Sequence, residues 1–441
     1  MTVGTKTRRV VGGLERGRKS SVKRFLDQYG DVRRFTEQLS APLEIEDYVI
    51  QSMPDVSPTK WHLGHTTWFF ETNILVPAYP GYVPFDPQFA YLFNSYYVSL
   101  GPRYFRPERG LLSRPTVKQI YDYRLHVNRH VQELFQDLSV DSLDQWLRIL
   151  EIGIHHEQQH QELILTDIKH VFSISPLHPA YNRDGANSRQ DVKIPALEWI
   201  GHPEGVYTIG HDGRGFAYDN ELARHRLFLD SFQLASRLVT NGEYLEFIED
   251  GGYNEPLLWL SDGWNRVESE GWSAPLYWEK RDGRWWIMTL SGLKELDESE
   301  PVSHVSYYEA DAYSRWRGAR LATEGEWEVA AIDLPIDGNF VESGNLHPAA
   351  LEKGGSEKHP SQMFGDVWEW TQSHYSPYPG FKPLSGALGE YNGKFMSNQF
   401  VLRGGSCATS RTHIRSTYRN FFPGDARWQF SGIRLARNLE E

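Results

Sequence analysis

Apolar residues recur at three- and four-residue spacing through most of the first 175 positions, which is the pattern of amphipathic helices. The clearest examples are SVKRFLDQYGDVRRFTEQLS, TVKQIYDYRLHVNRHVQELFQDL and SLDQWLRILEIGIHHEQQHQELILTDIKHVF. Loops containing proline and glycine separate these segments, and long amphipathic helices bury their apolar faces against one another. The pattern therefore predicts a helical bundle over residues 20–175.

The pattern changes after a polar, turn-rich stretch at residues 176–195, which we interpret as a linker. From residue 196 onward, short apolar runs such as GVYTIG, RLFLDSFQLAS, RWWIMTL and FVLRGGS alternate with Gly, Asn, Asp and Pro. NGEYLEFIEDGG and SYYEADAYSRWRG are the two clearest helical segments there. Trp61, Trp68 and Trp146 are the only ones of the 15 tryptophans that precede residue 190. Residues 196–441 are therefore expected to form a loop-rich α+β domain with an aromatic core.

Composition excludes several classes of protein. The formal charge of −12 over 441 residues disfavours non-specific binding to nucleic acid or to an anionic membrane. The single cysteine, Cys407, rules out an internal disulfide, a zinc ribbon and an iron–sulfur cluster. Residues 1–19 are basic and lack an apolar segment, so we expect a disordered leader and not a signal peptide. These features favour a cytoplasmic protein, and they leave open whether it forms a homo-oligomer.

The strongest chemical signal is His156-Glu157-Gln158-Gln159-His160, an HExxH motif inside a predicted helix. Histidines four residues apart lie on one helix face, so both imidazoles can bind one metal ion. The same motif occurs in zinc hydrolases, where its Glu is the general base. The downstream sequence QELILTDIKH lacks the further zinc ligand expected of such enzymes. A third ligand must come from elsewhere, and His62 and His65 in the aromatic segment SPTKWHLGHTTWFFE are the candidates.

Two further groups suit a reaction site. Tyr96 and Tyr97 are adjacent phenols, and a tyrosine in a metal pocket can donate a proton. Arginine recognises carboxylates in a bidentate manner, and four arginines follow the tyrosines, at Arg103, Arg106, Arg109 and Arg114. A second histidine pair, His126 and His130, more simply fits a helix surface.

Five segments in the second half resemble, in order, the formylglycine-generating-enzyme-type domain, which has a C-type-lectin-like fold. They are GVYTIG, HRLFLDSFQLASRLVTNGEYLEFI, RLATEGEWEVAA, FGDVWEWT and VLRGGS. The first half, with WHLGH and HEQQHQE, is similar to a DinB-like helical bundle. Joined in this order, the two halves resemble the ergothioneine-biosynthesis sulfoxide synthases over nearly the whole chain beyond residue 20. The implied fold class is α plus α+β, with the bundle first.

The resemblance implies a non-haem iron(II) enzyme that uses O2 to join the sulfur of cysteine or γ-glutamylcysteine to C2 of hercynine. It places the iron ligands at His65, His156 and His160, with Gln159 bonded to the substrate imidazole. Asn420, Phe421 and Phe422 match the region that meets the trimethylammonium group, and Arg106 and Arg109 are expected to bind carboxylates. Some family members use a tyrosine shortly before LRGG as proton donor. Tyr391 is offset from that position, so we expect Tyr96 or Tyr97 to act instead.

Other readings remain open at this point. A related synthase that acts on histidine, of the ovothiol type, has the same overall pattern, and a zinc HExxH hydrolase fits the motif alone. The copper-dependent formylglycine-generating oxidase needs a cysteine pair that this chain lacks. A lectin-like binding module would contain no stoichiometric metal.

Overall fold

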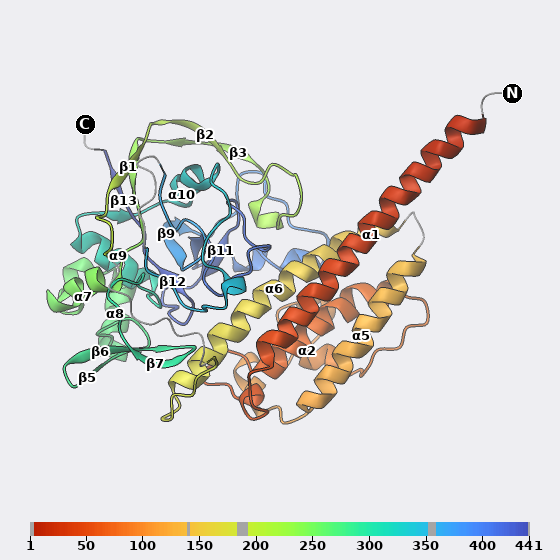
Figure 1. Cartoon of the computed structure of the whole chain (residues 1–441), viewed down its shortest axis with the longest axis horizontal. Helices are drawn as coiled ribbons and strands as arrows, with labels where there is room; N and C mark the ends of the chain where they lie inside the picture. The colour runs from red at the N-terminus through yellow and green to blue at the C-terminus, as the bar shows by residue number, and fades with distance from the viewer. Residues whose placement is uncertain (1–3, 139–141, 183–192, 352–358, 440–441) are drawn as a thin grey trace. The chain divides into compact units, whose positions relative to one another are not determined.

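The computed structural model describes residues 4–138, 142–182, 193–351 and 359–439 (Figure 1). The chain divides into two compact units, Met1–Ile164 and Leu165–Glu441. The predicted boundary near residue 175 falls at the end of a long helix, whose last turns belong to the second unit. Most of the predicted linker, residues 183–192, lies outside the described residues.

Helices form the first unit, as the apolar spacing predicts. The α-helices are α1 Gly4–Ser40, α2 Thr59–Phe70, α3 Val76–Ala78, α4 Phe89–Leu92, α5 Val117–Asp137 and α6 Leu143–Ser173, the last extending into the second unit. Between α2 and α3 lies a π-helical turn, η2 Glu71–Leu75, and short 3-10 turns are η1 Asp47–Val49, η3 Val98–Leu100 and η4 Arg106–Leu111. A capping box between Thr116 and Gln119 fixes the start of α5.

The expectation of a disordered leader at residues 1–19 is wrong for the described part, because α1 begins at Gly4. Residues 1–3 lie outside the described residues. No proline occurs before Pro42, so nothing in the sequence interrupts the backbone hydrogen bonds of a helix that continues to Ser40.

Close packing inside the first unit depends on a glycine of α6. A Cβ atom at Gly153 would lie 2.3 Å from Cε1 of Phe70 and 2.9 Å from Cε1 of Phe69. Both phenylalanines are fully buried on α2. Gly153 therefore allows α6 to approach α2, and the two helices together carry the candidate metal ligands.

The second unit is the loop-rich α+β domain that the sequence predicts. Among its described residues are two four-stranded sheets, with strand orders β1-β4-β13-β8 and β11-β10-β9-β12, a β2-β3 ribbon and a β5-β6-β7 sheet. The strands are β1 Trp199–His202, β2 Gly205–Ile209, β3 His225–Leu229, β4 Phe232–Ala235, β5 Trp278–Arg281, β6 Arg284–Thr289, β7 Gly292–Glu295, β8 Arg320–Leu321, β9 Trp368–His374, β10 Phe400–Arg403, β11 Asn420–Phe422, β12 Ser431–Gly432 and β13 Leu435–Asn438.

Four α-helices accompany these sheets among the described residues: α7 Asn241–Glu249, α8 Ser261–Glu270, α9 Tyr307–Trp316 and α10 Glu324–Ala331. The two helical segments predicted from the sequence are α7 and α9, so both predictions are confirmed. The sequence pattern gives no clear helical signal for α8 or α10. Buried ion pairs connect segments that are far apart in the sequence, as between Arg434 and Glu369 of β9 at 2.8 Å and between Arg419 and Glu324 of α10 at 2.8 Å. No helix among the described residues has the length and apolarity that crossing a membrane requires.

Candidate metal centre

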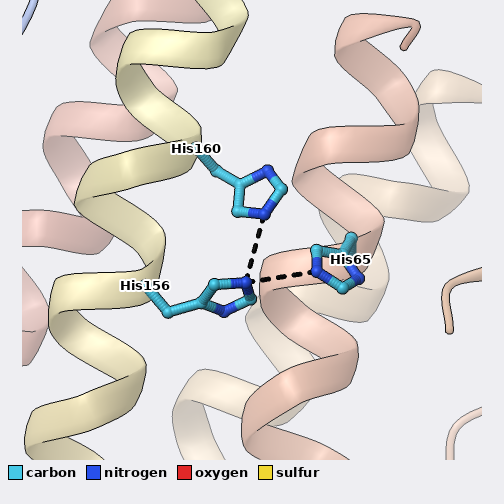
Figure 2. A group of neighbouring side chains, drawn as sticks. All are labelled: His65, His156 and His160. Atoms are coloured by element: carbon cyan, nitrogen blue, oxygen red, sulfur yellow. Dashed lines mark hydrogen bonds between the residues drawn. The ribbon is translucent and has the colours of Figure 1, made fainter. Parts of the chain in front are cut away.

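Three imidazoles in the first unit face one another (Figure 2). His156 and His160 lie one turn apart on α6, and His65 projects from α2. The Nε2 atom of His156 is 3.2 Å from Nε2 of His65 and 3.1 Å from Nε2 of His160. One ligand atom from each of the three lies within 4.8 Å of the others, and all three side chains are buried. We call His65, His156 and His160 the three-histidine cluster.

The nitrogen spacing in the cluster suits a common metal ion. Two nitrogen ligands that bind one ion at about 2.1 Å and at right angles are about 3.0 Å apart. The two measured separations, 3.2 and 3.1 Å, are close to this value. Three nitrogens arranged on one side of an ion leave its other coordination positions for substrates.

His65 is fixed by contacts on both faces and at its outer nitrogen. Its ring stacks on Trp61 at 4.6 Å and 11°, and on Trp68 at 5.4 Å and 17°. Its Nδ1 is 2.6 Å from the carbonyl oxygen of Phe93. A carbonyl oxygen only accepts hydrogen bonds, so Nδ1 carries the proton and Nε2 presents a lone pair to the cluster.

Burial also keeps the cluster uncharged. Desolvation lowers the pKa of His156 to about 3. It holds the pKa values of His65 and His160 well below their usual range, and neighbouring imidazoles and the Arg109 guanidinium add to the effect. Neutral imidazole is the form that binds a metal ion.

Glu157, the acidic residue of the HExxH motif, faces away from this chemistry. Its fully buried carboxylate accepts hydrogen bonds from Arg33 at 2.8 Å, from Arg124 at 3.0 Å and from the Thr36 hydroxyl at 2.7 Å. The desolvation cost would raise its pKa, but the two guanidinium groups outweigh it and lower the pKa to about 2. A carboxylate that is ionised and bonded in this way is unsuited to act as the general base of a zinc hydrolase.

The predicted tyrosines lie in the same unit as the cluster. Tyr97 is fully buried and its ring lies 5.6 Å from that of Trp68, which itself stacks on His65. Tyr96 is half-buried and stacks on Tyr97 at 4.6 Å. Trp68 therefore lies next to both His65 and Tyr97, and Tyr96 in turn lies next to Tyr97.

The two predicted arginines have different environments. Arg109 is buried, with its guanidinium 3.3 Å from the centre of the Trp61 ring and its Nη1 2.9 Å from the Ser57 hydroxyl. Arg106 is exposed and donates a hydrogen bond to the carbonyl oxygen of Asp55. Of these two arginines, only Arg109 is therefore held against Trp61, which stacks on His65.

The remaining predicted site residues are described separately. Gln159 is half-buried on α6 beside His160. Asn420, Phe421 and Phe422 form β11 in the second unit. His126 and His130 lie together on α5, with ring centres 4.2 Å apart, and are not part of the cluster.

The sequence analysis did not identify the two arginines that hold Glu157 or the carbonyl of Phe93. A signal for Arg124 exists, because it lies on the apolar face of α5 between Ile120 and Val127, which are both fully buried. An arginine at such a position indicates a buried partner of opposite charge. The sequence contains no such signal for a backbone carbonyl.

Comparison with known proteins agrees with the observed architecture. Residues 186–350 and 353–439 match the sulfatase-modifying factor enzyme 1-like domain. The chain is 32% identical to hercynine oxygenase of Mycobacterium tuberculosis, over 88% of this chain and 92% of that protein. It is 36% identical to hercynine oxygenase of Mycolicibacterium smegmatis, over 53% and 60% of the two chains. It is also 30% identical to ergothioneine biosynthesis protein 1 of Schizosaccharomyces pombe, over 51% and 28%. The chain therefore belongs to the hercynine oxygenase family.

Proposed function

We propose that the chain is an iron(II)- and O2-dependent sulfoxide synthase of ergothioneine biosynthesis, which joins a thiol sulfur to C2 of the hercynine imidazole. The observation that carries the proposal is the three-histidine cluster, in which Nε2 of His156 lies 3.1 Å from Nε2 of His160 and 3.2 Å from Nε2 of His65. It occurs in a chain that covers 92% of a hercynine oxygenase at 32% identity. The bundle that holds the cluster is, in this proposal, of the DinB-like type.

The donor set suits iron(II). Imidazole nitrogen is a ligand that iron(II) accepts, and three ligands on one side resemble the facial arrangement of non-haem iron oxygenases with a histidine in place of the carboxylate. His65, His156 and His160 would hold the ion, which would supply the binding and reduction of O2. Because all three imidazoles are neutral, they leave the charge of the ion uncompensated. That charge favours binding of the thiol substrate as a thiolate.

The aromatic residues of β11 are suited to a quaternary ammonium group. Phe421 stacks on Tyr375 at 4.1 Å and 10°, and its ring is 5.6 Å from that of Phe395. The trimethylammonium group of hercynine has no hydrogen-bond donor, so aromatic faces are the groups that recognise it. We assign Phe421, with Asn420 and Phe422, to this end of the substrate, and Gln159 to its imidazole.

Arg109 is the stronger of the two arginine candidates for a substrate carboxylate. It is 3% exposed, and its stacking on Trp61 fixes the plane of the guanidinium. A guanidinium held in one plane loses little entropy when it forms a bidentate pair with a carboxylate. We favour cysteine over γ-glutamylcysteine as the sulfur donor. Arg106 would contribute to the binding of a substrate carboxylate from the surface of its loop.

A zinc hydrolase is the second candidate that the HExxH motif suggests. The ion pairs of Glu157 with Arg33 and Arg124 argue against it, because the carboxylate is turned away from the cluster and already accepts three hydrogen bonds. A synthase that uses histidine in place of hercynine would bind a substrate whose amine is not methylated. The β11 aromatic group favours the methylated substrate.

The test is turnover by the full chain loaded with iron(II) under anaerobic conditions. Hercynine is supplied with cysteine or with γ-glutamylcysteine, O2 is admitted, and products are identified by mass spectrometry. We expect the hercynine sulfoxide conjugate, in higher yield with cysteine, and little product when histidine replaces hercynine or zinc replaces iron. Absence of any conjugate with both thiols, from protein that retains iron, would contradict the proposal.

A further inference from the structure

His62 contacts His160, one member of the three-histidine cluster. Its Nδ1 is 2.8 Å from Nδ1 of His160, and His62 is 2% exposed. The Nε2 of His160 is on the other side of that ring, 3.1 Å from Nε2 of His156. His62 therefore contacts His160 at the nitrogen that does not face the cluster, and the group of possible ligands does not include it.

The short contact between the two Nδ1 atoms requires one proton between them. Two nitrogens at 2.8 Å form a hydrogen bond only if one donates and the other accepts. His160 presents a lone pair at Nε2 only when its single ring proton is on Nδ1. Nδ1 of His160 must then donate, and Nδ1 of His62 must accept, so the proton of His62 is on its Nε2.

We infer that His62 is a positioning residue that selects the metal-binding tautomer of His160 and holds its ring with Nε2 toward the cluster. The inference rests on the proposed function only in that the cluster binds iron(II). Outer hydrogen bonds of this kind orient metal-binding histidines and increase their basicity.

Comparison with His65 supports the assignment. The Nδ1 of His65 donates to the carbonyl oxygen of Phe93 at 2.6 Å, so the same task is performed there by the backbone. His160 lies on α6, and a side chain of α2 provides the acceptor instead. The link between His62 and His160 thus joins the two helices that carry the cluster. Unlike the Phe93 carbonyl, this acceptor can be removed by mutation.

The test compares His62→Ala with His62→Gln, whose side-chain oxygen restores an acceptor near the same place. Iron(II) affinity of the full chain is measured anaerobically by competition with a chelator, and the absorption spectrum of the cobalt(II) form reports the ligand geometry. We expect His62→Ala to weaken iron(II) binding about 10–100-fold and to change the cobalt spectrum. We expect His62→Gln to recover most of the affinity and the wild-type spectrum.

His126→Ala is the matched control, because His126 is a half-buried histidine of the same unit outside the cluster. It should leave affinity and spectrum unchanged. Wild-type affinity in His62→Ala would overturn the inference, as would complete loss of binding in both His62 variants, which would identify His62 as a ligand. Failure of the wild-type chain to bind iron(II) would instead overturn the proposed function. Melting temperatures of all variants identify any loss of fold, and a folded His62→Gln suffices for the test.

Discussion

The buried carboxylate of Glu157 is 2.8 Å from Nη1 of Arg33, although the two residues are far apart in the sequence. Arg124 contributes a second ion pair at 3.0 Å. This arrangement gives the acidic residue of the HExxH motif a structural role and leaves the metal chemistry to the histidines on either side of it.

Replacing Glu157 by Gln tests this role. The variant leaves two buried guanidinium groups without their anion, and breaking a buried pair costs about 3–5 kcal/mol. We expect urea unfolding, followed by circular dichroism, to show destabilisation of this size, while the folded variant still binds one metal ion. Glu133→Gln is the control, because Glu133 forms an exposed pair with Arg129 and should cost less than about 1 kcal/mol. Loss of metal binding without loss of stability would contradict the structural role.

The same carboxylate predicts a dependence of stability on pH. The pKa of Glu157 is lowered to about 2 in the folded chain, against about 4.3 in an unfolded chain. The folded state therefore binds fewer protons, and the stabilisation is fully present above pH of about 4.3 and lost as the pH falls toward 2. We expect the unfolding free energy of the wild type to fall more steeply between these values than that of Glu157→Gln. Equal slopes would show that Glu157 does not have this pKa.

Lys169 predicts a dependence of the same sign, but at higher pH, in the second unit. Its Nζ is fully buried, 2.6 Å from Nε2 of His304, and burial lowers the pKa of Lys169 to about 7. An unfolded lysine titrates at about 10.4, so the unfolded state binds more protons and stability rises with pH between 7 and 10. We expect Lys169→Met to remove part of this rise, measured by chemical unfolding at several pH values. The exposed Lys118→Met should not change it.

The close approach of α6 to α2 predicts a cost for one methyl group. Gly153→Ala would place a Cβ 2.3 Å from Cε1 of Phe70, and overpacking of this kind costs about 1–3 kcal/mol. Alanine is favoured over glycine in a helix by about 1 kcal/mol, so the clash should prevail. Gly30→Ala, whose Cβ would meet only the flexible end of Arg34, should be neutral or stabilising. A Gly153→Ala chain as stable as the wild type would contradict the prediction, because it would show that α2 and α6 can move apart at no cost in free energy.

The tyrosine assignment predicts a change in product. If Tyr96 or Tyr97 donates the proton during sulfoxide formation, Tyr96→Phe combined with Tyr97→Phe should divert turnover toward dioxygenation of the thiol. The ratio of sulfinate to sulfoxide conjugate, measured by mass spectrometry, is the readout, and the single variants identify the donor. Tyr391→Phe is the comparison, and an unchanged ratio in the double variant would exclude both phenols.

Periodicity predicts α5 well, because that helix buries one face and the spacing of its apolar residues is strictly local. It also predicts α6, although nearly every position of α6 between residues 153 and 169 is buried. It cannot choose between His62 and His65, which are three residues apart on α2 and both buried. The choice depends on which of the two rings places a nitrogen beside Nε2 of His156, which is a property of packing. The partners of Glu157, Arg33 and Arg124, are also far from it in the sequence. Only their placement on apolar helix faces indicates them. The family resemblance supplied the choice of His65 that the residues alone left open.

The central claim is that His65, His156 and His160 bind one iron(II) ion. The most direct measurement is the iron content of the full chain after anaerobic loading and removal of excess metal, compared with each single alanine variant. We predict one iron per wild-type chain and loss of stoichiometric iron in all three variants, each of which should remain folded by circular dichroism. Full iron content in any one of the folded variants would contradict the claim.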